Sequence, residues 1–304
     1  MIDETAAGVF TIAVTPFLPD GAVDWSSVDS MVDFYISKGA TGLTILGMMG
    51  EAGKLTAEES LTIVERVVAR SSVSTIVGVS AAGFVAMKTL ADAAMDAGAV
   101  GVMVAPPSNL RTDDQIVAYY HNVADVLGVV PFVLQDFPLV TNVIMSPSVI
   151  LKIIEDCPTC MMLKHEDWPG LEKISTLRAA SDGGARRISV MCGNGGLYLL
   201  EEMLRGADGA MTGFAYPEMM SQVIEALNNN EGHARNIFDA YMPMIRYEAQ
   251  PGIGLAIRKY TLAQRGAIAY ETLRKPSVTL SAIARSEIDT LAARQKVKLK
   301  EINP

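Results

Sequence analysis

The most reactive candidate in the sequence is a lysine that closes a short apolar run. Residues 160–163 are all apolar, and Lys164 follows them directly. Burial disfavours the charged form of a lysine, and a neutral amine can attack a carbonyl carbon and form a Schiff base. A surface lysine, with its stem over apolar neighbours and its ammonium group in water, fits the same pattern. The residues alone leave both interpretations open.

A second candidate is the turn after the apolar run 42–46. It reads Gly47, Met48, Met49, Gly50 and Glu51. A turn bounded by glycines can point successive backbone N–H groups at an anion without any side-chain chemistry. A tight connection between a strand and a helix, with no ligand, has the same composition. The turn is therefore expected to bind an anion such as a carboxylate only if a reactive group lies next to it.

Polar groups also follow two other apolar runs. Gln135 and Asp136 come after 131–134, and His165 comes directly after Lys164, followed by Glu166 and Asp167. Acidic and imidazole groups can bind a metal ion, but the chain has 3 histidines and only His165 lies at the end of a run. We therefore expect no metal site, and no motif for a bound cofactor is present.

Glycines form the third kind of signal. Gly193, Gly195 and Gly196 follow the run 188–191. Phosphate groups often bind at this position in barrel enzymes, so a phosphosugar enzyme is one alternative.

Eight apolar runs provide the elements that must position these groups. They are short, rich in Val, Ile, Leu and Met, and alternate poorly, which is typical of parallel strands buried on both faces. Their starts lie roughly 20 to 35 residues apart, as expected for strand–helix units. The runs are 9–14, 42–46, 75–79, 100–104, 131–134, 160–163, 188–191 and 209–211.

Helix signals occupy the intervals between these runs. Asp24 can cap a helix over 25–37, and Thr56 with Glu59 forms a capping box for a helix ending near Arg70. Pro147 stands at the first position of a later helix. Eight such units predict an α/β fold, a (β/α)8 TIM barrel over residues 1–228, with a helical extension over 229–304 packed on the barrel. A doubly wound sheet is less consistent, because no G-x-G-x-x-G motif follows the first strand.

Composition limits the classes of partner. The formal net charge is -9, hydrophobic residues make up 50% and charged residues 19%. An acidic chain without a basic block is a poor match for nucleic acid or an anionic membrane. The chain has 3 cysteines and no disulfide pattern, so we expect a cytoplasmic protein.

These residues together resemble the dihydrodipicolinate synthase / N-acetylneuraminate lyase family of class I aldolases. The resemblance includes Val14-Thr15-Pro16-Phe17, Asp20-Gly21, Val23-Asp24, Gly47-x-x-Gly50-Glu51, Leu55, Pro138 and Lys164. It implies a homotetramer built as a dimer of dimers. It implies a Schiff base between Lys164 and pyruvate or another 2-oxo acid. It also implies that the turn, through the N–H groups of Met49 and Gly50, binds the substrate carboxylate, with Gly213 as a further substrate contact.

The sequence departs from the family at the groups that move protons. Gln135 stands where family synthases have a tyrosine, and Met48 stands where they have a threonine. Ser108 matches the tyrosine that a neighbouring subunit contributes, and Val140 matches the arginine that binds the aldehyde substrate's carboxylate. A glutamine cannot act as an acid or base, and such proton transfer is worth roughly 10²–10⁴-fold in rate.

The sequence therefore predicts a class I lyase that cleaves, condenses or dehydrates a 2-oxo acid, with an aldehyde as second substrate in an aldol reaction. Lys164 is the expected nucleophile, Gln135 is expected to position the substrate, and Asp136 or His165 to carry the proton. Two alternatives remain besides the phosphosugar enzyme. One is a non-catalytic barrel that binds a keto acid, and the other is an authentic 4-hydroxy-tetrahydrodipicolinate synthase despite the changes.

Overall fold

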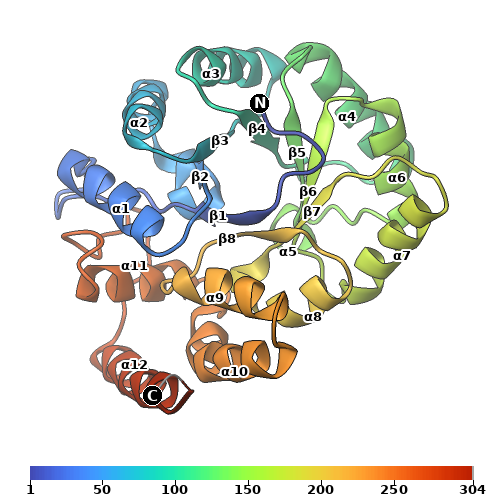
Figure 1. Cartoon of the computed structure of the whole chain (residues 1–304). Helices are drawn as coiled ribbons and strands as arrows, with labels where there is room; N and C mark the ends of the chain where they lie inside the picture. The colour runs from blue at the N-terminus through green and yellow to red at the C-terminus, as the bar shows by residue number, and fades with distance from the viewer. Residues whose placement is uncertain (303–304) are drawn as a thin grey trace.

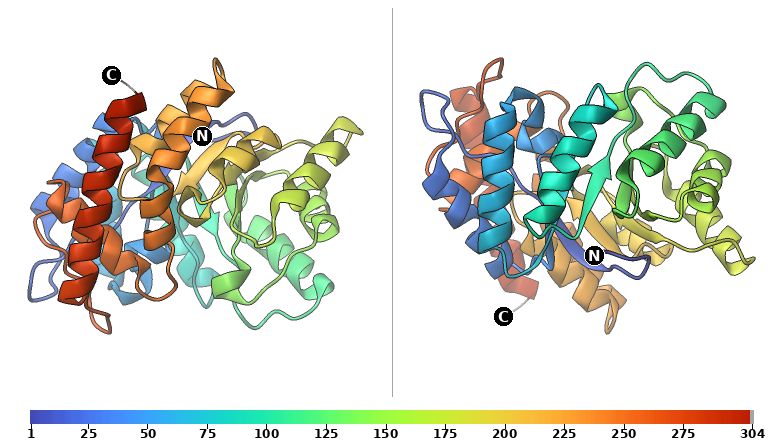
Figure 2. Two further views of the ribbon diagram at one scale, coloured as in Figure 1. Left: turned by 90° about the horizontal axis from the view of Figure 1, so that it is seen from below. Right: turned by 90° about the horizontal axis from the view of Figure 1, so that it is seen from above.

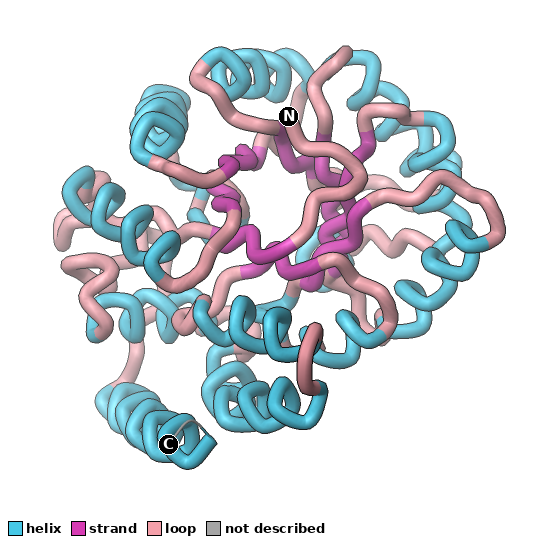
Figure 3. Tube along the Cα trace, viewed as in Figure 1, coloured by secondary structure: helices cyan, strands magenta, loops and turns pink. Residues whose placement is uncertain are grey.

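Eight parallel strands pair in sequence order and close into a barrel, with helices around it (Figures 1 and 3). This computed structural model describes residues 1–302 and confirms the predicted (β/α)8 fold. The strands are β1 (Gly8–Ile12), β2 (Gly42–Ile45), β3 (Ser74–Gly78), β4 (Gly101–Val104), β5 (Phe132–Asp136), β6 (Cys160–His165), β7 (Ser189–Cys192) and β8 (Gly209–Thr212).

The helices begin where the capping residues predicted. Asp24 accepts a hydrogen bond from the Ser27 amide, and Thr56 and Glu59 form a complete capping box. The helices up to the end of the barrel are α1 (Trp25–Ser37), α2 (Ala57–Arg70), α3 (Phe84–Asp96), α4 (Asp113–Leu127), α5 (Pro138–Thr141), α6 (Pro147–Asp156), α7 (Leu171–Asp182), α8 (Leu199–Leu204) and α9 (Glu218–Leu227). Short 3₁₀ turns are η1 (Met48–Gly50), η2 (Ala52–Lys54) and η3 (Asn194–Gly196).

Two strands continue further than the sequence indicated. β5 includes Gln135 and Asp136, and β6 includes Lys164 and His165. In the paired register, Gln135 lies beside Lys164 and Asp136 beside His165. Because side chains alternate along a strand, Gln135 and Lys164 point to one side of the barrel wall, and Asp136 and His165 point to the other.

The barrel interior is a packed layer of apolar side chains that alternate with the outward-facing ones. A single buried cluster fills it, consisting of Ile2, Phe10, Ile12, Ile76, Met103, Val133, Met162, Met191 and Met211. The outward-facing residues of the same strands, such as Leu134 and Leu163, belong to a second cluster shared with the helices. The barrel is therefore closed by side chains and leaves its C-terminal rim as the place for a site.

Three more helices follow the barrel: α10 (Glu231–Glu248), α11 (Gly254–Gln264) and α12 (Ala282–Ile302). The expected boundary at 228/229 falls between α9 and α10, and α12 runs along α10 on the outside of the molecule (Figure 2). Residues 303 and 304 of the expected extension lie outside the described residues. Within residues 1–302, no helix is both long and apolar enough to cross a membrane.

Candidate active site

Lys164 lies at the C-terminal end of β6 and faces the barrel interior. It is two residues after Met162, which belongs to the interior cluster, and it is 5% exposed. Its Nζ lies 2.9 Å from Oε2 of Glu166, whose side chain is also buried. The surface interpretation of this lysine is therefore wrong: the amine is inside the rim and paired with one carboxylate.

Glu166 also lies at this rim, although in the sequence it stands out only as one of several polar groups after Lys164. Its Oε2 accepts a hydrogen bond of 2.7 Å from Nε2 of Gln135, so one carboxylate oxygen joins Gln135 and Lys164. A Cβ at position 193 would overlap Cγ of Glu166, so Gly193 provides the space for this side chain. The available signal was its spacing, because a residue two positions after Lys164 faces the same side of the wall.

The turn after β2 forms the other part of the rim. Gly50 donates its N–H to the carbonyl oxygen of Gly47 at 3.0 Å, and Glu51 donates to that of Met48 at 3.0 Å. The first N–H groups of a helical turn have no acceptor within it, and here these belong to Met48 and Met49. The Gly50 N–H is therefore engaged, and the pair of amides suited to an anion shifts by one residue, to Met48 and Met49. The Met49 side chain packs against the interior cluster.

Glu51 has a structural position instead of a place at the rim. Its backbone is left-handed, with φ 55°, and its side chain is 4% exposed. Oε1 lies 2.6 Å from Nζ of Lys259, and Oε2 lies 2.9 Å from Nζ of Lys54. The Glu51 carboxylate therefore binds two lysines, and this corrects the prediction that it contacts the substrate.

Asp136 and His165 point away from Lys164, toward the helices. Asp136 Oδ2 accepts a 2.6 Å hydrogen bond from Nζ of Lys173 in α7, and Nδ1 of His165 lies 3.0 Å from Oε1 of Glu202 in α8. Burial raises the pKa of Asp136 to about 6, although Lys173 opposes that shift. This placement corrects the prediction that Asp136 or His165 carries the proton, because the strand alternation holds both on the far side of the wall.

Gly213 makes room for a guanidinium group. A Cβ there would overlap Nη1 of Arg258, which extends from α11. Arg258 is 5% exposed, and its Nε donates to Oε1 of Glu248 at 2.7 Å. Its Nη1 is buried and has no hydrogen-bond partner among residues 1–302. The side-chain space beside Gly213 is therefore filled by Arg258, which no motif in the sequence singles out.

The glycines after β7 do not form a phosphate cradle. The Gly193 N–H donates to the carbonyl of His165 at 2.8 Å, and the Gly196 N–H donates to that of Gly193 at 2.9 Å. The Gly195 N–H donates to Oγ1 of Thr212 at 2.7 Å. Since these three amides are engaged internally, the geometry opposes the phosphosugar alternative. Within the described part of the chain, no group of three or more His, Cys, Asp or Glu residues is arranged to hold a metal ion.

The relay positions and the arginine position that depart from the family pattern lie toward the surface, with Gln135 as the exception. Met48 is 38% exposed and Val140 is 52% exposed, and Ser108 is exposed as well. Gln135, by contrast, is 2% exposed and sits beside Lys164. Among the side chains at these four positions, only that of Gln135 is therefore buried next to Lys164.

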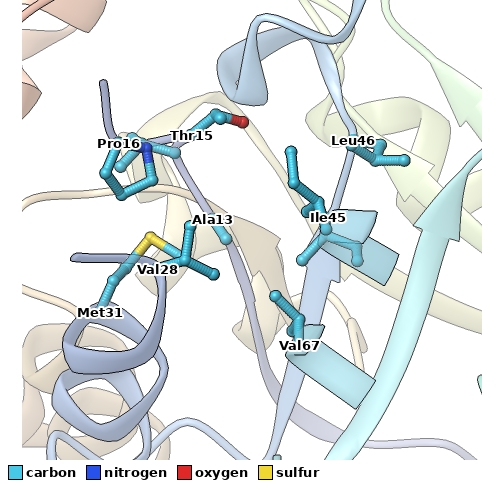
Figure 4. A pocket seen from close by; sticks show the side chains of 10 residues that line it. Ala13, Thr15, Pro16, Val28, Met31, Ile45, Leu46 and Val67 are labelled. Carbon is cyan, nitrogen blue, oxygen red and sulfur yellow. The ribbon is translucent and has the colours of Figure 1, made fainter. Parts of the chain in front are cut away.

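A small cavity elsewhere belongs to the packing of the wall. Figure 4 shows it between β1, β2 and the helix α1, lined by Ala13, Val28, Met31 and Ile45 among others. Its volume is about 10 Å³, which is room for about one water molecule. The lining is largely apolar and includes none of the rim residues described above.

The closed parallel barrel defines a (β/α)8-barrel protein, with a paired lysine and carboxylate at its C-terminal rim. The model of the dihydrodipicolinate synthetase family matches residues 5–295, and the chain belongs to that family. Its members are lyases, and this chain is an enzyme of that class. The family resemblance seen in the sequence is thereby confirmed.

Curated relatives and solved structures agree with this assignment. An L-2-keto-3-deoxyarabonate dehydratase of Azospirillum brasilense is 28% identical over 94% of both chains. A 4-hydroxy-tetrahydrodipicolinate synthase of Pseudomonas putida (strain W619) is 27% identical over 93% of this chain and 96% of that protein. The crystal structure of a dihydrodipicolinate synthase from Rhodopseudomonas palustris is 50% identical, with a TM-score of 0.95 over 96% of this chain and 99% of that one.

Proposed function

We propose that the chain is a class I lyase in which Lys164 forms a Schiff base with the C2 carbonyl of a 2-oxo acid. The observation that carries this proposal is the 2.9 Å contact between Lys164 Nζ and Glu166 Oε2 at the barrel rim. An amine becomes nucleophilic only after it loses a proton, and an adjacent carboxylate can accept that proton.

The proton balance of Schiff-base formation fits this pair. The Lys164 ammonium gives one proton to Glu166, and the neutral amine attacks C2 to form a C–N bond. Glu166 returns the proton to the former carbonyl oxygen, which leaves as water with a second proton from the nitrogen. The products are a protonated imine and one water molecule, so the total charge is unchanged.

The same carboxylate is suited to the next step. The protonated imine acidifies the C3–H bond, and Glu166 takes that proton to give an enamine. It then delivers a proton to a leaving hydroxyl group at C4, and water departs. Glu166 thereby performs the work for which family synthases use a phenol, and Gln135 holds its carboxylate through the 2.7 Å hydrogen bond.

The substrate carboxylate belongs at the N–H groups of Met48 and Met49. Both lie at the start of η1, where the first backbone N–H groups have no acceptor within the turn. Gln135 lies beside Lys164 in the strand register and orients the substrate as well as Glu166.

Among lyase reactions we favour dehydration of a 3-deoxy-2-oxo acid. The support is the similarity to the A. brasilense dehydratase together with an acid–base group that both takes and returns a proton. Condensation of pyruvate with an aldehyde is a second candidate, favoured by the 50% identity to the R. palustris synthase. The glutamine at 135 and the valine at 140 oppose it, because the phenol and the arginine expected for that reaction are absent from these positions.

The experiment is incubation of the protein with L-2-keto-3-deoxyarabonate and mass spectrometry of the product. A product lighter by one water supports dehydration, and release of pyruvate indicates aldol cleavage. Lys164→Ala is expected to abolish either reaction, whereas Lys88→Ala, an exposed lysine paired with Asp92, is the matched control. Unchanged turnover in Lys164→Ala contradicts the proposal.

We also propose that the enzyme works in the cytoplasm as a homotetramer. All three cysteines are free and buried, which suits a reducing compartment. The family resemblance supports the dimer of dimers, and light scattering of the purified chain tests it directly.

A further inference from the structure

A second hollow lies outside the barrel, between α12 and the helices that close it. Its volume is about 630 Å³, within the range of small-molecule sites. Its lining combines aromatic, cationic and amide groups and is given by Tyr216, Glu218, Tyr241, Arg265, Ala292, Ala293, Gln295, Lys296, Leu299 and Lys300. We call this hollow the α12 groove, and none of its residues belongs to the rim around Lys164.

Gln295 is the anomaly that draws attention to the groove. It is 5% exposed, and its Oε1 is buried without a hydrogen-bond partner in the described part of the chain. The other inward-facing residues of α12 are apolar, including Ile288, Leu291 and Leu299. An unpaired buried amide oxygen is unfavourable by roughly 1–3 kcal/mol. A leucine at this position would avoid that loss, so the amide is explained better by a ligand than by packing.

The charges along the groove favour an anion. Lys296 and Lys300 lie one turn apart on α12, and neither has a salt-bridge partner among residues 1–302. Arg265 and Glu218 neutralise each other through a 2.5 Å contact, and the guanidinium stacks on the ring of Tyr216. The net positive charge of the groove therefore comes from Lys296 and Lys300.

The remaining polar groups favour hydroxyls on that anion. The rings of Tyr216 and Tyr241 lie 5.9 Å apart and line the groove beside Gln295. Phenol and amide groups pair well with a ligand hydroxyl, which can both donate and accept. This dual capacity satisfies Gln295 in either orientation of its amide.

We propose that the α12 groove is a ligand site separate from the barrel rim, and that it binds a hydroxylated carboxylic acid of sugar-acid size. The carboxylate pairs with Lys296 and Lys300, and a hydroxyl group fills the hydrogen-bonding requirement of Gln295. Tyr216 belongs to the loop after β8, so a bound ligand also contacts the segment that leads away from the rim. This inference does not depend on the proposed reaction.

The test is calorimetric titration of the full chain with D-gluconate. Sorbitol provides the hydroxyls without the charge, hexanoate provides the charge without the hydroxyls, and inorganic phosphate tests for a simple anion site. We expect one gluconate per chain with a dissociation constant of about 1 mM or below, and at least about tenfold weaker binding of the other three probes.

Substitutions in the α12 groove test whether gluconate binds there. Gln295→Leu and the pair Lys296→Gln/Lys300→Gln are each expected to weaken gluconate binding at least about tenfold. Lys298→Gln is the matched control, because Lys298 lies on the same helix outside the groove and faces Glu301. The lysine pair is exposed, so its loss leaves folding intact even if Gln295→Leu alters packing. Absence of gluconate binding, equal binding of phosphate, or binding unaffected by both groove variants overturns the proposal.

Discussion

The two faces of β5 and β6 carry similar residue types but have different surroundings. On the inner face, Gln135, Lys164 and Glu166 meet at one carboxylate oxygen at the rim of the barrel. On the outer face, Asp136 and His165 contact Lys173 and Glu202 from the surrounding helices. A shift of one residue along β5 and β6 therefore separates the group at the rim from the group that packs against the helices.

A buried lysine with an ion-pair partner is therefore not by that fact alone a catalytic group. Lys173 is as buried as Lys164 and makes two ion pairs, with Asp136 and Asp167 at 2.6 Å each. Lys173 extends from α7 and joins the outer side of β5 to the segment after β6. Lys164 differs by lying on the inner side of the wall, at the C-terminal rim where barrel enzymes hold their sites.

The largest expected effect comes from removing the inner lysine. Lys164→Ala removes the nucleophile, so we expect turnover to fall by at least about a thousandfold. The substitution also leaves the buried Glu166 carboxylate without its lysine, so the free energy of unfolding should fall as well, and turnover is compared per folded molecule. Steady-state assays and urea unfolding of the same preparation measure both quantities, and turnover within tenfold of the wild type would place the nucleophile elsewhere.

The second-largest effect is expected from replacing the Glu166 carboxylate at the rim. Glu166→Gln retains the shape and loses the proton carrier, so kcat should fall roughly 10²–10⁴-fold. Since proton transfer slows while Lys164 remains, an imine should still form with pyruvate, but more slowly. Stopped-flow detection of the imine beside a turnover assay separates the two steps. A kcat close to that of the wild type would remove Glu166 from the mechanism.

The outer face should respond in stability instead of rate. Lys173→Met leaves the buried carboxylate of Asp136 without its partner, and breaking a buried ion pair costs about 3–5 kcal/mol. The double variant Lys173→Met/Asp136→Leu removes both charges and should recover much of that loss. Urea unfolding measures each free energy. A loss of kcat without a loss of stability would contradict the structural role.

The smallest effect is expected at His165. His165→Asn removes one hydrogen bond to Glu202 and should lower the free energy of unfolding by roughly 1–3 kcal/mol. We expect kcat per folded molecule to stay within about threefold of the wild type, since the ring never reaches the rim. A rate loss comparable to that of Glu166→Gln would mean that His165 takes part in proton transfer.

The fold, Lys164 and the turn 47–50 could be predicted from the sequence. Strand order follows from eight apolar runs at regular spacing, and Lys164 and the turn 47–50 stand out because each follows such a run. The sequence favours Asp136 or His165 for the proton step instead of the proposed Glu166, because the apolar runs end before Gln135 and Lys164 while the strands continue past them. When those residues are taken as loop residues, the alternation of side chains along β6, which places Glu166 and His165 on opposite sides, does not apply. Arg258 could not be predicted from the sequence, because its position depends on packing against Gly213, far away in the chain.

The most direct measurement is reduction of the protein with borohydride in the presence of pyruvate, followed by intact mass and peptide mapping. We expect one reduced pyruvate per chain, attached to Lys164 and absent from Lys173 and Lys259, the other buried lysines. Larger 2-oxo acids should give the same site. An adduct on another lysine, or no adduct under conditions that label a control aldolase, would contradict the assignment of the inner face as the site of chemistry.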